Sequence, residues 1–62
     1  MTSHRYQIIS HYDTGSTFTR WCDTPETAEE LANHLLGCQT NTGTIIHTQI
    51  IHNGQMINEW EY

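Results

Sequence analysis

The sequence TIIHTQIIHNGQMINEWEY at residues 44–62 contains the strongest turn signal in the chain, the dipeptide Asn53-Gly54. Asn-Gly favours a two-residue type I′ turn because both residues tolerate a positive φ angle. The isoleucine, threonine and aromatic residues on either side are typical of strands. This sequence therefore predicts an antiparallel hairpin with strands at residues 44–52 and 55–62.

A two-residue turn also predicts the register of this hairpin, because each residue before the turn then faces one residue after it. The expected pairs are His52 with Gln55, Ile51 with Met56, Ile50 with Ile57, His47 with Trp60 and Ile45 with Tyr62. One face is then expected to carry Ile45, His47, Gln49, Ile51, Met56, Asn58, Trp60 and Tyr62. The opposite face is expected to carry Ile46, Thr48, Ile50, His52, Gln55, Ile57, Glu59 and Glu61.

Residues 23–37, DTPETAEELANHLLG, predict one amphipathic helix before this hairpin. Thr24 suits the N-cap and Pro25 the first helical position, while Gly37 suits a left-handed C-terminal end. Apolar side chains recur at the i, i+3, i+4 and i+7 spacing of one helix face. These are Ala28, Leu31, Ala32 and Leu35.

Residues 5–22 predict an earlier hairpin, with strands at residues 5–12 and 16–22. Asp13-Thr14-Gly15 suits a type I turn followed by a left-handed glycine. One face is expected to carry Tyr6, Ile8, Tyr12, Phe18 and Cys22. The other is expected to carry Gln7, Ile9, His11, Thr17, Thr19 and Trp21.

The expected fold is therefore α+β, a single domain over residues 1–62 with the order β-β-α-β-β. One helix covers only one face of the four-stranded antiparallel sheet. The crossover through the helix is expected to be right-handed. We favour the strand order 2-1-3-4, with 1-2-4-3 as the alternative. The helix is expected on the face that carries Ile8, Phe18, Ile51, Met56 and Trp60.

The face without a helix is expected to carry large apolar side chains, namely Ile9, Trp21, Ile46, Ile50 and Ile57. A solvated sheet face is mostly polar, and full burial of such a side chain contributes roughly 1.5–3 kcal/mol. We therefore expect a partner protein or a second copy to bind there. The alternative is that scattered exposed isoleucines are normal, or that the registers differ from those above. Of these five, the partner-binding residues are expected to be Trp21, Ile46, Ile50 and Ile57.

The formal net charge is -5, and Arg5 and Arg20 are the only cations besides histidine. So few cations argue against direct binding of nucleic acid or of an anionic membrane surface. A negative surface instead predicts contact with a basic site, for example on a nucleic-acid-processing host protein. Solubility and helix-dipole stabilisation are the alternative explanation. The carboxylates expected to bind are Glu26, Glu29, Glu30, Glu59 and Glu61.

Cys22, His34 and Cys38 suggest a third possibility, a small metal-binding protein. The paired spacing of zinc ligands is missing, and a twelve-residue helix separates the cysteines by about 18 Å. Catalytic motifs are also missing, so we expect no enzyme, no metal and no cofactor. We see no long apolar span or secretory leader, which predicts a cytoplasmic protein, in the host cytoplasm if phage-encoded.

The length, the absence of lysine and a helix packed on hairpins resemble small accessory proteins of phages and mobile elements, such as anti-CRISPR-type inhibitors. The resemblance covers the whole chain but includes no diagnostic motif, so it assigns no residue a role. It implies a small acidic, non-enzymatic inhibitor that occupies a basic or apolar surface of a host protein. The alternative is a homodimeric structural or regulatory module without an inhibitory role.

Overall fold

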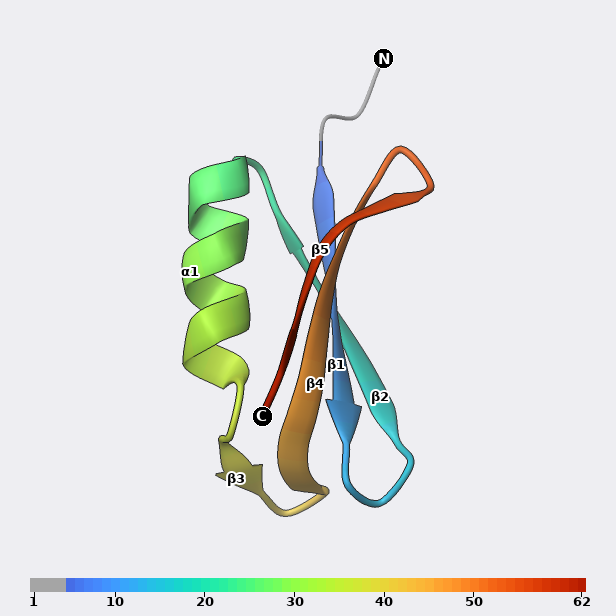
Figure 1. Cartoon of the computed structure of the whole chain (residues 1–62), viewed down its shortest axis with the longest axis vertical. Coiled ribbons are helices and arrows are strands. Elements are labelled where there is room, and N and C mark those ends of the chain that lie inside the picture. The colour runs from blue at the N-terminus through green and yellow to red at the C-terminus, as the bar shows by residue number, and fades with distance from the viewer. Residues whose placement is uncertain (1–4) are drawn as a thin grey trace.

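A computed structural model describes residues 5–62 and shows one helix packed on one side of an antiparallel sheet (Figure 1). Residues 1–4 of the expected domain lie outside the described residues. The elements are β1 (Tyr6–Tyr12), β2 (Thr17–Cys22), α1 (Pro25–Leu35), β3 (Gln39–Thr40), β4 (Gly43–His52) and β5 (Gln55–Glu61). The sheet order is β2-β1-β4-β3, and β5 also pairs with β4. The expected α+β class and the order of the two hairpins are confirmed, with the short β3 as an addition.

The first hairpin has the expected turn and register. The amide of Gly15 donates to the carbonyl of Tyr12 at 3.0 Å, and Gly15 has a φ angle of 94°. These are the features of a type I turn followed by a left-handed residue. Ile8 is opposite Arg20 and Ile9 is opposite Thr19. Ile8 is buried beneath α1, while Ile9 lies on the other face of the sheet because side chains alternate along a strand.

Local signals in the sequence define both ends of α1. The Thr24 hydroxyl accepts a hydrogen bond from the amide of Thr27, and Pro25 begins the helix. Gly37 follows the helix with a φ angle of 85°. Its hydrogen side chain also leaves room for the ring of Tyr62, which would overlap a Cβ at this position.

The second hairpin has the expected turn but a different register beyond it. Asn53 and Gly54 both have positive φ angles, as a type I′ turn requires. His52 pairs with Gln55 and Ile51 with Met56, as expected. Ile57 is then an extra residue, a β-bulge, so that Ile50 pairs with Asn58, Thr48 with Trp60 and His47 with Glu61. The expected pairs of Ile50 with Ile57 and His47 with Trp60 are therefore wrong.

The side of β4 that faces the helix also differs from the expectation. Thr48 and Ile50 face α1, and the Thr48 hydroxyl donates to the carbonyl of Ala32 at 3.2 Å. The expected positions of Ile51 and Met56 beneath the helix are wrong, because side chains directly opposite each other share a face and this pair lies on the far side. A second bulge at Ile46 brings Ile45 back to the helix side.

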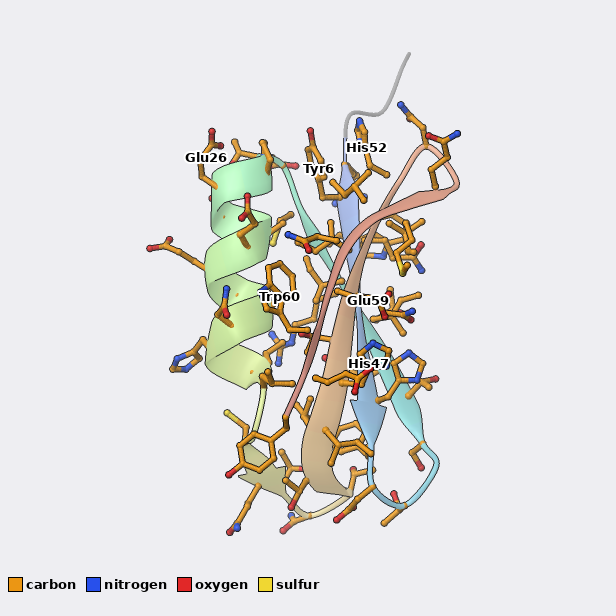
Figure 2. All side chains as sticks on the ribbon, viewed as in Figure 1. Tyr6, Glu26, His47, His52, Glu59 and Trp60 are labelled. Atoms are coloured by element: carbon orange, nitrogen blue, oxygen red, sulfur yellow. The ribbon has the colours of Figure 1, made fainter. Side chains whose placement is uncertain are left out.

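The core lies between α1 and the central strands. Its buried members are Ile8, Cys22, Ala28, Ala32 and Ile50, with Tyr6, Leu31, Leu35 and Trp60 packed against them. Trp60 lies between α1 and the sheet, as expected (Figure 2). Because alanine is small, Ala28 and Ala32 let the helix backbone approach the sheet closely. No helix within residues 5–62 has the length and hydropathy needed to span a membrane.

Candidate functional site

The face of the sheet opposite α1, here called the open face, has no covering element within residues 5–62 (Figure 1). Its side chains come from β1, β2, β4 and β5, and the registers define which residues belong to it. They are Gln7, Ile9, His11, Thr17, Thr19, Trp21, His47, Gln49, Ile51, Met56, Glu59 and Glu61.

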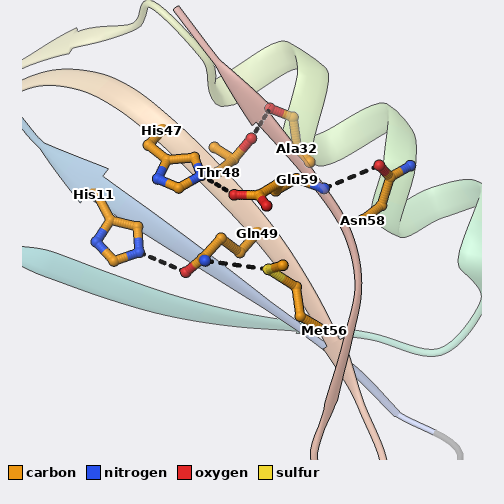
Figure 3. A network of polar contacts seen from close by, with 8 residues as sticks. All are labelled: His11, Ala32, His47, Thr48, Gln49, Met56, Asn58 and Glu59. Carbon is orange, nitrogen blue, oxygen red and sulfur yellow. Dashed lines mark hydrogen bonds and ion pairs between the residues drawn. The ribbon is translucent and has the colours of Figure 1, made fainter.

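Gln49 is at the centre of the open face and connects three strands. Its carbonyl oxygen accepts a hydrogen bond from the Nε2 of His11 on β1 at 2.7 Å. Its amide nitrogen donates to the sulfur of Met56 on β5 at 3.3 Å. Gln49 therefore holds side chains on both of the strands that flank β4 in fixed positions (Figure 3).

His47 and Glu59 form a second contact beside Gln49. The Nε2 of His47 lies 2.8 Å from a carboxylate oxygen of Glu59, and both side chains are partly exposed. The rings of His11 and His47 stack with centroids 5.2 Å apart. This stacking joins the two hydrogen-bonded groups into one polar cluster, made of His11, His47, Gln49, Met56 and Glu59 (Figure 3).

The polar cluster offers positioned hydrogen-bonding groups at a solvent-accessible surface. Its members contain no hydroxyl, thiol or amine. Because the two histidines donate through Nε2 to oxygen acceptors, their Nδ1 atoms point elsewhere and are acceptors when the rings are neutral. Side chains held in this way lose little further conformational freedom when another molecule binds them.

An apolar region lies next to the polar cluster on the open face. Ile9 and Ile51 are half-buried, while Trp21 is 54% and Met56 47% exposed. A hollow of about 310 Å³ lies beside Trp21, near the turn between β4 and β5. It is lined by Arg5, Gln7, Trp21, Ile51, Asn53 and Gly54. The guanidinium of Arg5 lies 5.8 Å from the Trp21 ring centroid, within the range of a cation–π contact.

The residues expected to bind a partner are distributed over different parts of the molecule. Trp21, Glu59 and Glu61 lie on the open face. Ile46 and Ile57 are exposed and occupy the two bulges. The expected position of Ile50 on the uncovered face is wrong, since Ile50 is 1% exposed and packs beneath α1. Because Ile57 is the bulged residue, Ile50 pairs with Asn58.

The acidic residues of α1 do not share a surface with the open face. Glu26, Glu29 and Glu30 are exposed on the helix, which lies on the other side of the sheet from Glu59 (Figure 2). The carboxylates expected to bind one basic site therefore form two separate groups. Of the two groups only that on β5 reaches the polar cluster, since Glu59 belongs to it and Glu61 is opposite His47.

Sequence reasoning placed His11 on the uncovered face but did not recognise it as part of a site, and it placed His47, Gln49, Ile51 and Met56 on the wrong face. The bulge at Ile57 places Trp60 opposite Thr48 beneath α1, so Trp60 does not share a face with Met56, Ile51, Gln49 and His47 as an unbulged hairpin would require. The double isoleucines 45–46 and 50–51 place an apolar residue on either face, so alternation alone does not show which face is buried.

The third possibility raised by the sequence was a metal site formed by Cys22, His34 and Cys38. Cys22 is buried near the start of α1, and Cys38 follows its end, where its thiol donates to the carbonyl of His34 at 3.1 Å. Both cysteines are free. Within residues 5–62, His, Cys, Asp and Glu side chains nowhere gather in a group of three or more that could hold a metal ion.

The open face thus combines hydrogen-bonded polar groups, exposed apolar side chains and a hollow. No protein-family model matches the sequence, and no curated protein or solved structure is significantly similar to it.

Proposed function

We propose that this chain is a small acidic, non-enzymatic protein-binding module whose docking surface is the open face. The observation that carries the proposal is that this face combines exposed Trp21 and Met56 with a hydrogen-bonded polar cluster and has no cover within residues 5–62. Aromatic residues and methionine are enriched in protein interfaces. Burial of these side chains would add apolar contact to a domain whose own core is small.

The geometry supports a protein partner with a protruding anchor side chain. Binding energy concentrates where an anchor fills a pocket at the centre of an interface. The hollow beside Trp21 offers a place for an anchor at one end of the open face, and the polar cluster presents hydrogen-bonding groups already in position towards its centre. The partner is therefore expected to insert one side chain beside Trp21 and to cover His11 and Gln49.

Charge supports a partner with a basic rim. Glu59 and Glu61 border the open face on β5, in a chain of net charge -5. Charges at the rim of an interface steer association and select the partner. A basic rim of this kind surrounds the phosphate-binding site of a nucleic-acid-processing protein. By occupying such a site the chain acts as an inhibitor, as its resemblance to small phage proteins implies.

A photo-crosslinking amino acid tests this function by its position. We would place it at Met56 on the open face, and at Glu30 on α1 as the matched exposed control. Irradiation of the intact chain in its natural host cell should yield one dominant crosslinked protein from position 56. Position 30 should yield only background.

Competition then tests whether the crosslink reports specific binding. Excess unlabelled chain should abolish the crosslink from position 56, and chain with the substitution Gln49→Lys should not compete. A dominant crosslink from position 30, or none from position 56, would contradict the proposed docking surface.

A further inference from the structure

The two edges of the sheet differ in how well they are protected against pairing with another strand. At one edge β5 carries the bulge at Ile57 and the carboxylates Glu59 and Glu61. Bulges and charges are the usual protection of an edge strand. At the other edge β2 pairs with β1 in an uninterrupted register, and its one charged side chain, Arg20, lies over the ring of Phe18 on the helix side of the sheet. The edge of β2 is therefore the one open to strand addition.

The backbone groups of β2 that point outward follow from its pairing with β1. The amide of Tyr12 donates to the carbonyl of Ser16 at 2.8 Å, so these two residues form a bonded pair. Bonded pairs alternate along an antiparallel ladder. The backbone N–H and C=O groups therefore point towards β1 at every second residue from Ser16, which includes Phe18 and Arg20. The groups of Thr17, Thr19 and Trp21 point away from β1.

The side chains of β2 are large and exposed on both sides of the sheet. Phe18 is 48% exposed on the helix side, and Trp21 is 54% exposed on the open face. Thr17 and Thr19, on either side of Phe18 in the sequence, have high strand propensity. The guanidinium of Arg20 lies 5.2 Å from the centroid of the Phe18 ring. A strand added at this edge would cover aromatic side chains on both faces at once.

We propose that β2 pairs with β2 of a second copy, antiparallel and with the two-fold axis at Thr19. The ladder forms only if the outward-pointing residues of one strand lie opposite outward-pointing residues of the other. One strand can therefore shift along the other only by two residues at a time. In the register centred on Thr19, Thr17 faces Trp21 of the second copy, and all three outward residues of each strand are bonded. Moving the centre to Arg20 would place two guanidinium groups opposite each other.

The register centred on Thr19 is also self-complementary in its side chains. Arg20 lies directly opposite Phe18 of the second copy, on the same face of the joined sheet. The cation–π contact seen within the chain is then repeated across the two-fold axis. These pairs make a second copy a better occupant of this edge than a strand of unrelated sequence.

This pairing goes beyond the proposed function because it defines the assembled form of the module. Residues directly opposite each other share a face, so both helices lie on one side of the joined sheet and both open faces on the other. The dimer then presents two docking surfaces side by side. Pairing of β2 with β5 of another copy would instead give an open-ended chain of molecules, which the bulge at Ile57 opposes.

Two lysine substitutions in the same strand test the register. Thr19→Lys places two like charges directly opposite each other, and we expect it to raise the dimer dissociation constant about tenfold or more. Thr17→Lys adds the same charge to the same face but lies opposite Trp21 of the second copy. It should change the constant by less than about threefold, since lysine over tryptophan is favourable.

Sedimentation equilibrium over a concentration series measures this directly, because the monomer has a mass of only 7.2 kDa. The unmodified chain should sediment at twice this mass at high micromolar concentration. A monomer at all concentrations, a series of larger polymers, or equal effects of both lysines would overturn the pairing. If the chain is monomeric but still crosslinks to a partner from position 56, the β2 pairing is wrong and the proposed docking surface is retained.

A disulfide test does not depend on the folding of the lysine variants. In a Cys38→Ser background, Thr19→Cys should form a disulfide-linked dimer on mild oxidation, because Cα atoms in a bonded pair lie about 5.5 Å apart. Thr17→Cys is the control, since its two copies would be separated by roughly 13 Å or more along the strand. Equal crosslinking of both variants would contradict a two-fold axis at Thr19.

Discussion

Ser10 and Thr48 are buried hydroxyl side chains that face each other across β1 and β4. The Thr48 hydroxyl donates to the carbonyl of Ala32, whereas the Ser10 oxygen has no hydrogen-bond partner within residues 5–62. A buried polar group without a partner destabilises the folded state by the cost of its lost hydration. Two residues of similar chemistry and equal burial are therefore expected to contribute with opposite sign to stability.

Ser10→Ala is expected to raise the free energy of unfolding by about 1 kcal/mol, because it removes an unsatisfied hydroxyl. Thr48→Val keeps the shape of the side chain but loses a hydrogen bond, and it should lower the same free energy by about 1 kcal/mol. Urea denaturation followed by tryptophan fluorescence measures both. A destabilised Ser10→Ala variant would show that Ser10 has a hydrogen bond in solution.

His47 and Glu59 form a partly exposed side-chain contact at 2.8 Å, and exposed polar pairs contribute little to stability. A double-mutant cycle with His47→Gln and Glu59→Gln should give a coupling energy below about 1 kcal/mol at neutral pH. The polar cluster would then serve to position side chains and not to hold the fold together. A coupling of several kcal/mol, measured by urea denaturation, would contradict this interpretation.

At the scale of the elements, the helix and both hairpin turns were predictable because their signals are local. Thr24 and Pro25 begin α1, Gly37 follows its end, and Asn53-Gly54 forms the predicted turn. These residues act through backbone angles and capping that depend on few neighbours. The two-residue strand β3 was missed because its polar residues resemble a loop.

The faces of β4 and β5 were not predictable, because each bulge inserts a residue that itself favours a strand. Ile46 and Ile57 have high strand propensity, so nothing in the local sequence marks them as extra. The bulged pairing of β4 with β5 is selected only by the packing of the complete sheet against α1. The candidate site shares this limit, because without the bulge at Ile57 the buried Trp60 would share a face with His47, Gln49 and Met56.

The bulge at Ile57 allows a test of edge protection. Deleting Ile57 would leave Met56 opposite Ile51 and Asn58 opposite Ile50, so the same side chains still face α1. The fold should therefore be retained, while the straighter β5 becomes a better template for pairing. Light scattering should show concentration-dependent polymers that the parent chain lacks. Unchanged association would mean that the carboxylates of β5 alone protect this edge.

Charge reversal separates the two acidic groups, which lie on opposite sides of the sheet (Figure 2). If the open face is the docking surface, Glu59→Lys with Glu61→Lys should weaken partner binding more than Glu29→Lys with Glu30→Lys. Binding of the protein identified by crosslinking, measured by calorimetry at two salt concentrations, provides the comparison. A larger effect of the helix pair would support the expectation that the helix carboxylates bind a basic site.

At the scale of the whole molecule, the chain is a single sheet with cover on one side, and its extents are 36 × 18 × 17 Å. A chain of 62 residues buries only about 60% of the surface it exposes when unfolded, so its stability is modest. Any molecule that binds only the folded state raises that stability by mass action. A partner on the open face would therefore both occupy the site and stabilise the fold.

Methyl NMR of the chain with and without the crosslinked partner tests the central claim most directly, because isoleucine and methionine methyls report on both faces of the sheet. The account predicts that Ile9, Ile51 and Met56 on the open face shift or broaden, while the buried Ile8 and Ile50 beneath α1 change little. The opposite pattern, with unchanged open-face methyls and altered signals on the helix side, would contradict the open face as the docking surface.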